Sequence, residues 1–344
     1  MKTMRAAILV EPHLFDVREV EVPQVSEDEA LIRVHRTGIC GTDLHMFNGH
    51  YAADKLPLIP GHEFVGTVAT KGARVSHVKE GDRVVVDINI GCGTCFWCRR
   101  NEVLSCPSIS QIGIARNGAF ADYVSVPGRL VIKAPAALSD AELALTEPIA
   151  CVVRAARKSD IRFGQSVVIL GAGPIGNLHI QMMRLCGAAP IIVSDISHER
   201  CKLAQKAGAD FVVSDQTTLK QTILAHTSDR GADMVIESVG NSKLYQLAFE
   251  LIRKGGHVAF FGVTGPADTV AVNILDTILK ENSIKGSVAG MGEDMHDALT
   301  LLQHGRFKTD LFTSSAFPVE QIQNAFETVP SRPKDLKTQI VFNQ

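Results

Sequence analysis

Apolar positions in the first part of the chain fall into short runs that glycine and proline separate. The clearest runs lie at residues 30–40, 64–70 and 82–88. Runs of a few residues between turn residues are typical of short strands. We therefore expect an irregular all-β region from Arg5 to about Ile132. Segment 139–159 then changes to a helical period, with Ser139 or Asp140 as its N-cap.

The pattern changes again from Gln165 onward. Five short, nearly continuous apolar runs rich in β-branched residues alternate there with helical segments. These runs lie at 166–171, 190–195, 211–215, 233–240 and 257–262. Strands of this kind are buried on both faces, and their alternation with helices predicts a doubly wound parallel sheet. Two further helices, 295–307 and 319–329, and a last strand, 338–342, are expected after it.

Composition narrows the class of protein. A chain of 344 residues is long enough for two domains, and 45% hydrophobic with 21% charged residues is typical of a globular protein. The net charge of −2 argues against a nucleic-acid or membrane-surface partner. The apolar run Ala6–Val10 is too short for a signal peptide, and no stretch reaches the length of a membrane span. We expect a cytoplasmic protein, in which clustered thiols are metal ligands rather than disulfides.

The first apolar run of the second half ends in a glycine fingerprint. Gly171, Gly173 and Gly176 form G-x-G-x-x-G directly after a predicted strand, with Pro174 and Ile175 inside the motif. Gly171 permits the tight turn, Gly173 lets the backbone approach a pyrophosphate, and Gly176 lets the following helix pack close to the strand. The motif predicts a dinucleotide site. The alternative is a glycine-rich turn without a ligand.

An acidic residue follows at the spacing that a dinucleotide site requires. Asp195 ends the second run, nineteen residues after Gly176, where a carboxylate accepts hydrogen bonds from the adenosine ribose hydroxyls. A 2′-phosphate would meet that negative charge, so NAD is predicted over NADP. Arg200 is expected to stack on adenine or to stay solvated. Asp195 also has an ordinary alternative role as a helix N-cap.

Four of the eight cysteines lie within residues 91–106, spaced C-x2-C-x2-C-x7-C. They are Cys92, Cys95, Cys98 and Cys106. Four thiolates close a tetrahedral shell around one Zn²⁺ and leave no position for substrate, so a structural zinc is predicted. The alternatives are buried free thiols or an iron–sulfur cluster, although the fourth spacing differs from the bacterial ferredoxin pattern. Few basic and aromatic residues surround the cysteines, which argues against a nucleic-acid-binding ribbon.

A second set of metal-ligand and polar residues is spread along the chain. It comprises Cys40, Thr42, Asp43, His45, His62, Glu63 and Glu147. A mixed set of cysteine, histidine and carboxylate is the kind that leaves zinc one open coordination position. Each residue alone has an ordinary explanation as a small core residue, a loop histidine or a surface charge. Their occurrence beside a four-cysteine loop and a nucleotide fold favours a catalytic site.

Together these segments resemble a zinc-dependent medium-chain dehydrogenase/reductase of the alcohol dehydrogenase superfamily, over essentially the whole chain. The motifs that carry the resemblance are 38–45, 60–66, 81–86, the cysteine loop, 118–127, 147–148 and 171–176. Glu63 directly after His62, and Glu147 directly before Pro148, are most similar to the polyol (sorbitol-type) and L-threonine 3-dehydrogenase branch. Two positions depart from the common pattern: Ala119 replaces a frequent glycine and Asn177 a usual leucine.

The resemblance implies an α/β fold in two domains. Residues 1–150 with 292–344 would form a GroES-like irregular β catalytic domain, and residues 151–291 a Rossmann NAD-binding domain. The family also implies a homo-oligomer, a dimer or a tetramer, in which residues 282–290 often pair across the dimer.

The resemblance also assigns roles around a catalytic zinc, the second of two zinc ions per chain. Cys40 and His62 would bind it, with Glu63 as third ligand, directly or through water, or Glu147 in exchange with it. Asp43 would hold His62 and fix its tautomer. Thr42 would hydrogen-bond the substrate oxygen, and His45 would pass the proton to solvent.

The expected reaction is the reversible oxidation of a secondary alcohol to a ketone, with hydride transfer to NAD. Polyols, sugars and sugar acids are favoured, because neighbouring hydroxyls can bind the zinc and the carboxylates together. An amino alcohol such as L-threonine is the next candidate. Arg116 would favour a sugar acid if it received a carboxylate, and is otherwise a solvated loop residue. A non-catalytic NAD or zinc sensor and a zinc-free quinone or enoyl reductase are the alternatives from other classes.

Overall fold

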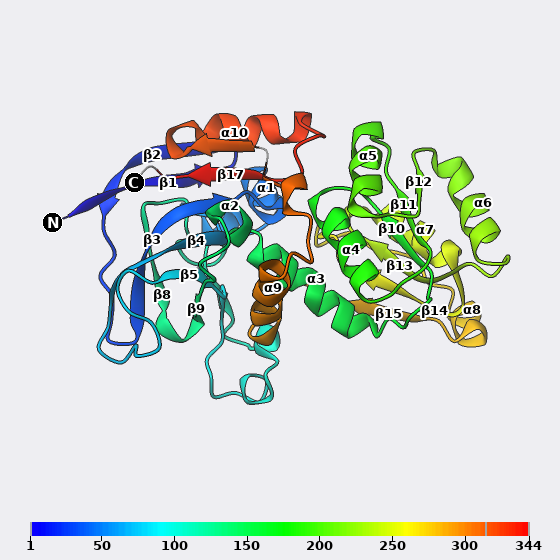
Figure 1. Cartoon of the computed structure of the whole chain (residues 1–344), viewed down its shortest axis with the longest axis horizontal. Coiled ribbons are helices and arrows are strands. Elements are labelled where there is room, and N and C mark those ends of the chain that lie inside the picture. The colour runs from blue at the N-terminus through cyan, green and yellow to red at the C-terminus, as the bar shows by residue number, and fades with distance from the viewer. Residues whose placement is uncertain (1, 314, 343–344) are drawn as a thin grey trace. The chain divides into compact units, whose positions relative to one another are not determined.

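The structure of the chain, a computed structural model, describes residues 2–313 and 315–342 and divides into two compact units (Figure 1). Unit 1 comprises residues 1–150, 289–305 and 312–344, and unit 2 comprises residues 151–288 and 306–311. Residues 289–291 therefore belong to unit 1 and residues 306–311 to unit 2, whereas the sequence analysis expected the reverse for both segments. Hydrogen bonds explain both segments: the Asn89 amide donates to the Gly290 carbonyl at 2.9 Å, and the Lys308 N–H donates to Gln181 at 2.6 Å.

Unit 1 is built on a mainly antiparallel sheet, in which β3 pairs with β4, β8 and β17. The sheet order is β16-β17-β3-β4-β5-β9, with β8 beside β3, and β16 and β17 run parallel. Its strands are β3 (Glu29–Gly38), β4 (Glu63–Lys71), β5 (Arg83–Val86), β8 (Tyr123–Pro127), β9 (Val131–Lys133), β16 (Ser315–Pro318) and β17 (Thr338–Val341). Two smaller pairs are β1 (Thr3–Glu11) with β2 (Leu14–Glu21), and β6 (Asn89–Ile90) with β7 (Ser110–Gln111).

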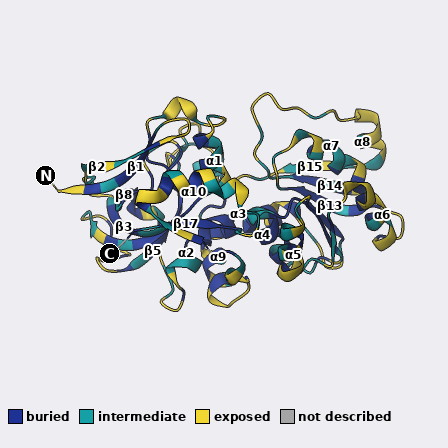
Figure 2. Ribbon diagram, turned by 90° about the horizontal axis from the view of Figure 1, so that it is seen from above, coloured by how far each residue is buried: buried dark blue, intermediate teal, exposed yellow. Residues whose placement is uncertain are grey.

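Short helices complete unit 1 and close its core. They are α1 (Gly41–Phe47), α2 (Asp140–Leu143), α9 (Glu293–Gln303) and α10 (Ile322–Thr328), with the start of α3 (Thr146–Ser159). Helix α10 lies along β2 (Figure 1) and packs Phe326 against Phe15 and Phe120, with ring centroids 4.8 and 5.8 Å apart. Figure 2 shows the resulting buried stretches of the strands. The expected irregular β region is therefore confirmed.

Unit 2 is a six-stranded, fully parallel sheet with the order β12-β11-β10-β13-β14-β15. Its strands are β10 (Val167–Leu170), β11 (Ile191–Ser194), β12 (Phe211–Val213), β13 (Ala232–Glu237), β14 (Ile252–Phe260) and β15 (Ser283–Gly286). Its helices are α4 (Pro174–Leu185), α5 (His198–Ala207), α6 (Gln216–His226), α7 (Ser242–Leu251) and α8 (Ile274–Lys280). One apolar core lies under α4 and α5 and a second under α6 and α7. The doubly wound sheet and all five predicted strands are confirmed.

The helical segment predicted at 139–159 consists of two helices. Ser139 is the N-cap of α2: its hydroxyl accepts a hydrogen bond from the Glu142 N–H, and the Glu142 carboxylate accepts one from the Ser139 N–H. This capping box is a common start signal for helices. Helix α3 begins only at Thr146.

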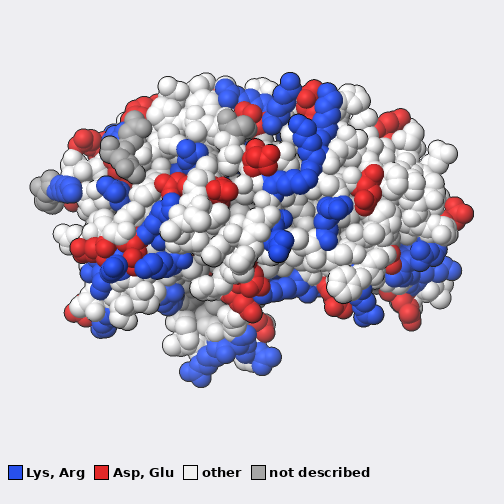
Figure 3. Space-filling model, in the orientation of Figure 1, with Lys and Arg blue, Asp and Glu red and all other residues white. Residues whose placement is uncertain are grey.

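Within the described residues, every helix is too short or too polar to cross a membrane. Basic and acidic side chains are interspersed on the face shown in Figure 3.

Candidate functional site

The turn that carries Cys40 is fixed by its own side chains. Cys40 is the N-cap of α1, and its backbone N–H donates to Oδ2 of Asp43 at 2.9 Å. Asp43 is buried, and its second oxygen, Oδ1, faces Nδ1 of His62 at 3.3 Å. Asp43 therefore connects the cysteine turn to the histidine, as expected of a residue that orients a metal-binding imidazole.

Cys40, His62 and Glu63 converge in unit 1. The sulfur, nitrogen and oxygen atoms that they offer all lie within 4.8 Å of one another, a spacing that suits bonds of about 2.0–2.3 Å to one Zn²⁺. His62 and Glu63 are buried, and the Lys337 ammonium lies 2.6 Å from Oε2 of Glu63. Cysteine sulfur, histidine nitrogen and carboxylate oxygen are ligand atoms of Zn²⁺ in proteins, so the three converging residues fit a zinc ion.

The electrostatics of His62 agree with this arrangement. Burial by itself lowers the pKa of His62, but the negative charges of Asp43 and Cys40 outweigh it and raise the pKa well above its ordinary value. A cation is therefore favoured at this position.

Thr42 and His45 lie on α1, three positions apart, and hence on one face of the helix. Both are half-buried. Burial and the nearby His50, whose ring centroid is 6.4 Å away, lower the pKa of His45. His45 is therefore a neutral imidazole at neutral pH, able to accept a proton.

Glu147 lies in the first turn of α3 and is buried. It does not belong to the group of Cys40, His62 and Glu63 whose ligand atoms lie within 4.8 Å of one another. Its negative charge nevertheless helps to raise the pKa of Lys337, which contacts Glu63.

Lys337 is a member of the site that the sequence analysis missed. Its side chain is only 5% exposed, and Nζ donates a hydrogen bond of 2.7 Å to Oε1 of Glu63. The local sequence gives one weak signal, a lysine directly before a short apolar strand. Its partner lies 274 positions away in the chain.

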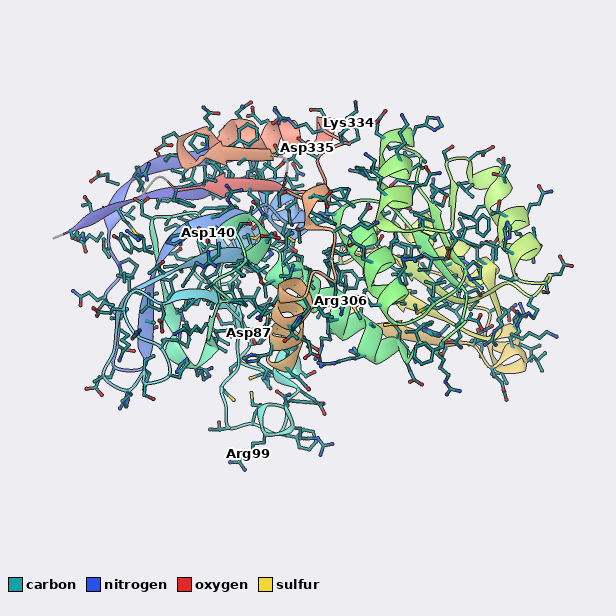
Figure 4. All side chains as sticks on the ribbon, viewed as in Figure 1. Asp87, Arg99, Asp140, Arg306, Lys334 and Asp335 are labelled. Atoms are coloured by element: carbon teal, nitrogen blue, oxygen red, sulfur yellow. The ribbon has the colours of Figure 1, made fainter. Side chains whose placement is uncertain are left out.

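The four cysteines of the 91–106 loop also form one group, with all sulfur atoms within 4.8 Å of one another. Backbone N–H groups of Cys92, Cys95 and Cys98 each donate to a cysteine sulfur at 3.4 Å. Hydrogen bonds from Thr94 and Cys95 lower the pKa of Cys92 to about 6, whereas burial and the neighbouring cysteines raise the pKa of Cys98. Donors aimed at sulfur stabilise thiolates, so this group fits a structural Zn²⁺. Arg99 projects from the tip of the loop (Figure 4).

The glycine fingerprint connects β10 to α4 in unit 2. Gly171 has φ +100°, a backbone conformation that favours glycine. A Cβ on Gly176 would lie 2.0 Å from the Gly171 carbonyl oxygen, so the helix approaches the strand closely. A Cβ on Gly173, the N-cap of α4, would meet nothing within 4 Å. Pro174 begins the first turn without an N–H of its own, and the N–H groups of Ile175 and Gly176 that follow in this turn suit a phosphate.

Asp195 is almost fully buried just beyond the end of β11, beside the fingerprint. Its carboxylate accepts hydrogen bonds from the Ala172 N–H at 2.7 Å and the Ser197 N–H at 2.8 Å. The N-cap of α5 is Ser197 rather than Asp195, so the alternative role of Asp195 as the N-cap is wrong. Arg200 is half-buried on α5, three residues beyond that cap.

Two of the other singled-out residues have specific contacts. The Asn177 amide donates to the carbonyl oxygens of Ala172 and Gly173, at 2.6 and 3.1 Å, and so ties the fingerprint turn to α4. Arg116 forms an ion pair with Glu29 at 3.5 Å. The sequence analysis expected either a substrate carboxylate or solvent beside Arg116 and did not predict this partner. Ala119 is fully buried.

A cavity of about 470 Å³ adjoins the carboxyl ends of β14 and β15, the edge where parallel α/β sheets bind ligands.

Comparisons with known proteins agree with this geometry. Residues 26–136 match the alcohol dehydrogenase GroES-like domain and residues 174–304 match the zinc-binding dehydrogenase family. D-arabinitol dehydrogenase 1 of Uromyces fabae is 31% identical, over 96% of this chain and 95% of that protein. L-threonine 3-dehydrogenase of Pyrococcus horikoshii is 34% identical, over 90% of each chain. The structure of alcohol dehydrogenase TADH from Thermus sp. ATN1 is similar with a TM-score of 0.92 and 30% identity, covering 99% of this chain and 100% of that one.

These matches confirm the resemblance drawn from the sequence, including the two-domain fold class. The chain therefore belongs to the zinc-dependent medium-chain alcohol dehydrogenases, enzymes that oxidise CH–OH groups with NAD.

Proposed function

We propose that this enzyme reversibly oxidises a secondary alcohol of a polyol, sugar or sugar acid to a ketone, with hydride transfer to NAD. The grouping of Cys40, His62 and Glu63 carries the proposal, because three protein ligands leave one position of a tetrahedral site for substrate. When bound, zinc would supply a Lewis acid that lowers the pKa of the substrate hydroxyl, and NAD would supply the hydride acceptor.

The chain's own residues bind the substrate and move the proton. Asp43 orients the His62 ring from its Nδ1 side. Thr42 hydrogen-bonds the substrate oxygen, and its hydroxyl passes the proton to the His45 imidazole. The lowered pKa of His45 supports this direction of transfer, because the ring is neutral when the proton arrives.

Two carboxylates support a polyhydroxylated substrate. Glu63 and Glu147 both raise the pKa of Lys337, so their charges act on one small region of unit 1. A second hydroxyl beside the reacting one would donate to such a carboxylate, which a simple alcohol cannot do. The relative from Pyrococcus horikoshii makes L-threonine the second candidate.

The cofactor preference follows from Asp195, whose carboxylate stands beside the fingerprint where a 2′-phosphate would be repelled. We propose NAD rather than NADP. None of the eight cysteines, all of which lie among the described residues, forms a disulfide, which suits a reducing compartment such as the cytoplasm.

NADH absorbance at 340 nm tests the reaction directly. Zinc-loaded protein with NAD⁺ or NADP⁺ is screened against polyols, sugar acids and L-threonine, with Cys40→Ser as the inactive control. We expect turnover with NAD⁺ on polyols or sugar acids. Turnover on L-threonine alone selects the second candidate, and no turnover by protein with both zinc ions bound contradicts the proposal.

We also infer a homo-oligomer built on the edge strand β15. Ile284 on this strand is 46% exposed, and α8 turns four apolar side chains to solvent that are 65–74% exposed. These are Ile274, Leu275, Ile278 and Leu279. An exposed apolar edge pairs readily with another strand, and a second copy offers the same edge across a two-fold axis. Sedimentation should give a dimer or tetramer for the wild type and smaller species for Ile284→Lys; a monomeric wild type contradicts the inference.

A further inference from the structure

Three polar side chains on the sheet of unit 1 form a chain of hydrogen bonds that belongs to neither metal-ligand group. Oγ1 of Thr67, on β4, lies 2.9 Å from Nε2 of His35, and Nδ1 of the same ring lies 2.9 Å from Oδ2 of Asp140. Asp140, labelled in Figure 4, is the first residue of α2. A hydroxyl, an imidazole and a carboxylate in this order are the arrangement of a nucleophilic triad.

The backbone holds the members of this chain in place. His35 stands at a β-bulge, because the pairing of β3 with β4 shifts register between Val34 and Arg36. Bulges turn a side chain away from its regular direction and are frequent beside active sites. Helix α2, which carries the carboxylate, is fixed to β17 by the Gln339 amide, which donates to the Ala141 carbonyl oxygen at 2.9 Å. The imidazole is therefore held between two elements that are themselves anchored.

The hydrogen bonds determine which atom carries each proton. The hydrogen bond from His35, together with the positive charges of Arg83 and Arg36, outweighs burial and lowers the pKa of Asp140. The ionised carboxylate can only accept, so Nδ1 of His35 carries the proton that lies between them. In a neutral ring Nε2 is then an acceptor. The Thr67 hydroxyl therefore donates to Nε2, and His35 is placed to remove its proton.

Thr67 also lies between two arginines. In the strand register it is directly opposite Arg33 of β3 and Arg83 of β5, and side chains directly opposite each other share one face of a sheet. Thr67 is half-buried and Arg33 is exposed, whereas the adjacent Val68 is buried in the core on the other face. A negatively charged group beside Thr67 would therefore meet two positive charges.

We propose that Thr67 is an acylation site that reacts with acyl phosphates, with His35 as general base and Asp140 as the positioning residue for His35. A bond forms between Oγ1 of Thr67 and the acyl carbon, and the bond from that carbon to the phosphate oxygen breaks. The hydroxyl proton passes through Nε2 of His35 to the departing phosphate, so the products are an acyl-threonine ester and inorganic phosphate. Arg33 favours this anionic donor, since a guanidinium binds phosphate well. The reaction needs neither zinc nor NAD.

Acetyl phosphate is the probe for this reaction. The full-length protein is incubated with it, phosphate release is recorded, and peptide mass spectrometry locates the acetyl groups. Hydroxylamine removes acetyl esters but not the acetyl amides that form on lysines, so it identifies the threonine product. Thr70 on the same strand is the internal control, because its hydroxyl donates to the Glu80 carboxylate at 3.0 Å rather than to an imidazole.

We expect a hydroxylamine-sensitive acetyl group on Thr67 and none on Thr70. Thr67→Ser should keep the reaction, and Thr67→Val, which has nearly the same shape without the hydroxyl, should lose it. His35→Gln and Asp140→Asn should each slow it by about 100-fold or more, and Asp140→Glu should recover part of the rate. Asp140→Asn carries the test should His35→Gln fail to fold. Cys40→Ser should react like wild type, because the reaction is independent of the proposed zinc site.

Three results would overturn the inference. The first is acetylation of lysines with neither an ester on Thr67 nor phosphate release that Thr67→Val abolishes. The second is an ester that forms on Thr67 as fast in His35→Gln as in wild type, or as fast on Thr70 as on Thr67. The third is loss of the ester in Cys40→Ser, which would assign the reaction to the metal site.

Discussion

Alanine substitutions at two glycines of the fingerprint should have different effects: Gly176→Ala should lower stability, and Gly173→Ala should weaken cofactor binding. Each substitution adds one methyl group to the same turn. At Gly176 the new carbon would lie 2.0 Å from the Gly171 carbonyl oxygen and 2.9 Å from its carbonyl carbon, well inside ordinary contact. At Gly173 it would meet no protein atom within 4 Å.

The structure sets the size of the two effects. The atoms facing Gly176 are backbone, so they cannot move aside as a flexible side chain would. Overpacking costs about 1–3 kcal/mol, and alanine returns about 1 kcal/mol of helix propensity. A contact of 2.0 Å with backbone atoms puts the overpacking cost at the upper end of that range, so the net loss is about 2 kcal/mol, which lowers the melting temperature by about 4–8 °C for a unit of this size. Gly173→Ala costs at most about 1 kcal/mol, the difference between glycine and alanine at an N-cap.

Cofactor affinity should follow a different order from stability. Gly173 faces open space at the N-terminus of α4, where the pyrophosphate is proposed to lie. Gly173→Ala should therefore weaken NAD binding at least about tenfold, or about 1.4 kcal/mol, with nearly unchanged melting. Thermal unfolding and calorimetric titration with NAD measure the two quantities. A Gly173→Ala protein that binds NAD like wild type would refute the proposed cofactor position, and a Gly176→Ala protein of wild-type stability would refute the close approach.

Other substitutions test other parts of the chain. Cys98→Ser should lower the zinc content from two ions to one per chain and speed tryptic cleavage at Arg99, while NAD binding stays intact; unchanged zinc content counts against the structural site. Asp195→Asn should reduce the preference for NAD over NADP about tenfold or more in kcat/KM, or about 1.4 kcal/mol, and an unchanged ratio would remove Asp195 from cofactor choice. Burial lowers the pKa of His179 to about 3. Below about pH 6.5 the unfolded chain therefore binds a proton at this histidine that the folded chain does not bind, so the free energy of unfolding decreases as the pH is lowered. His179→Leu should therefore lose less melting temperature than wild type between pH 7 and pH 5, and an equal loss would contradict this assignment.

Local signals explain why much of the fold was predictable from the sequence. The strands of unit 2 are β-branched runs buried on both faces, and the fingerprint sits where β10 meets α4. The capping box of Ser139 and Glu142 is likewise contained within four residues. In each case the interacting residues are close in sequence, so the pattern and the structure report the same physical constraint.

The features that sequence could not supply depend on contacts between distant segments. Residues 289–291 join unit 1 because Asn89 and Asp87 bind the backbone of Gly290 and Gly292. Asp87, labelled in Figure 4, is buried and accepts the Gly292 N–H at 2.7 Å. Asp87 and Gly292 are far apart in the sequence, so no local residue spacing predicts their contact. Lys337 was missed for the same reason, since an isolated lysine near a strand is usually a surface charge.

The two metal groups differ in how much of their geometry the protein supplies. Cys40 follows β3, His62 and Glu63 lie at the start of β4, and Lys337, directly before β17, balances the Glu63 charge from the other side of β3. Breaking a buried ion pair costs about 3–5 kcal/mol, so this ligand set is held in place by the fold. The cysteine loop between β6 and β7 has only short turns and strands of two residues at its base. Its order must come largely from the metal. Chelation should therefore unfold the loop while leaving the ligands of the reactive zinc in position.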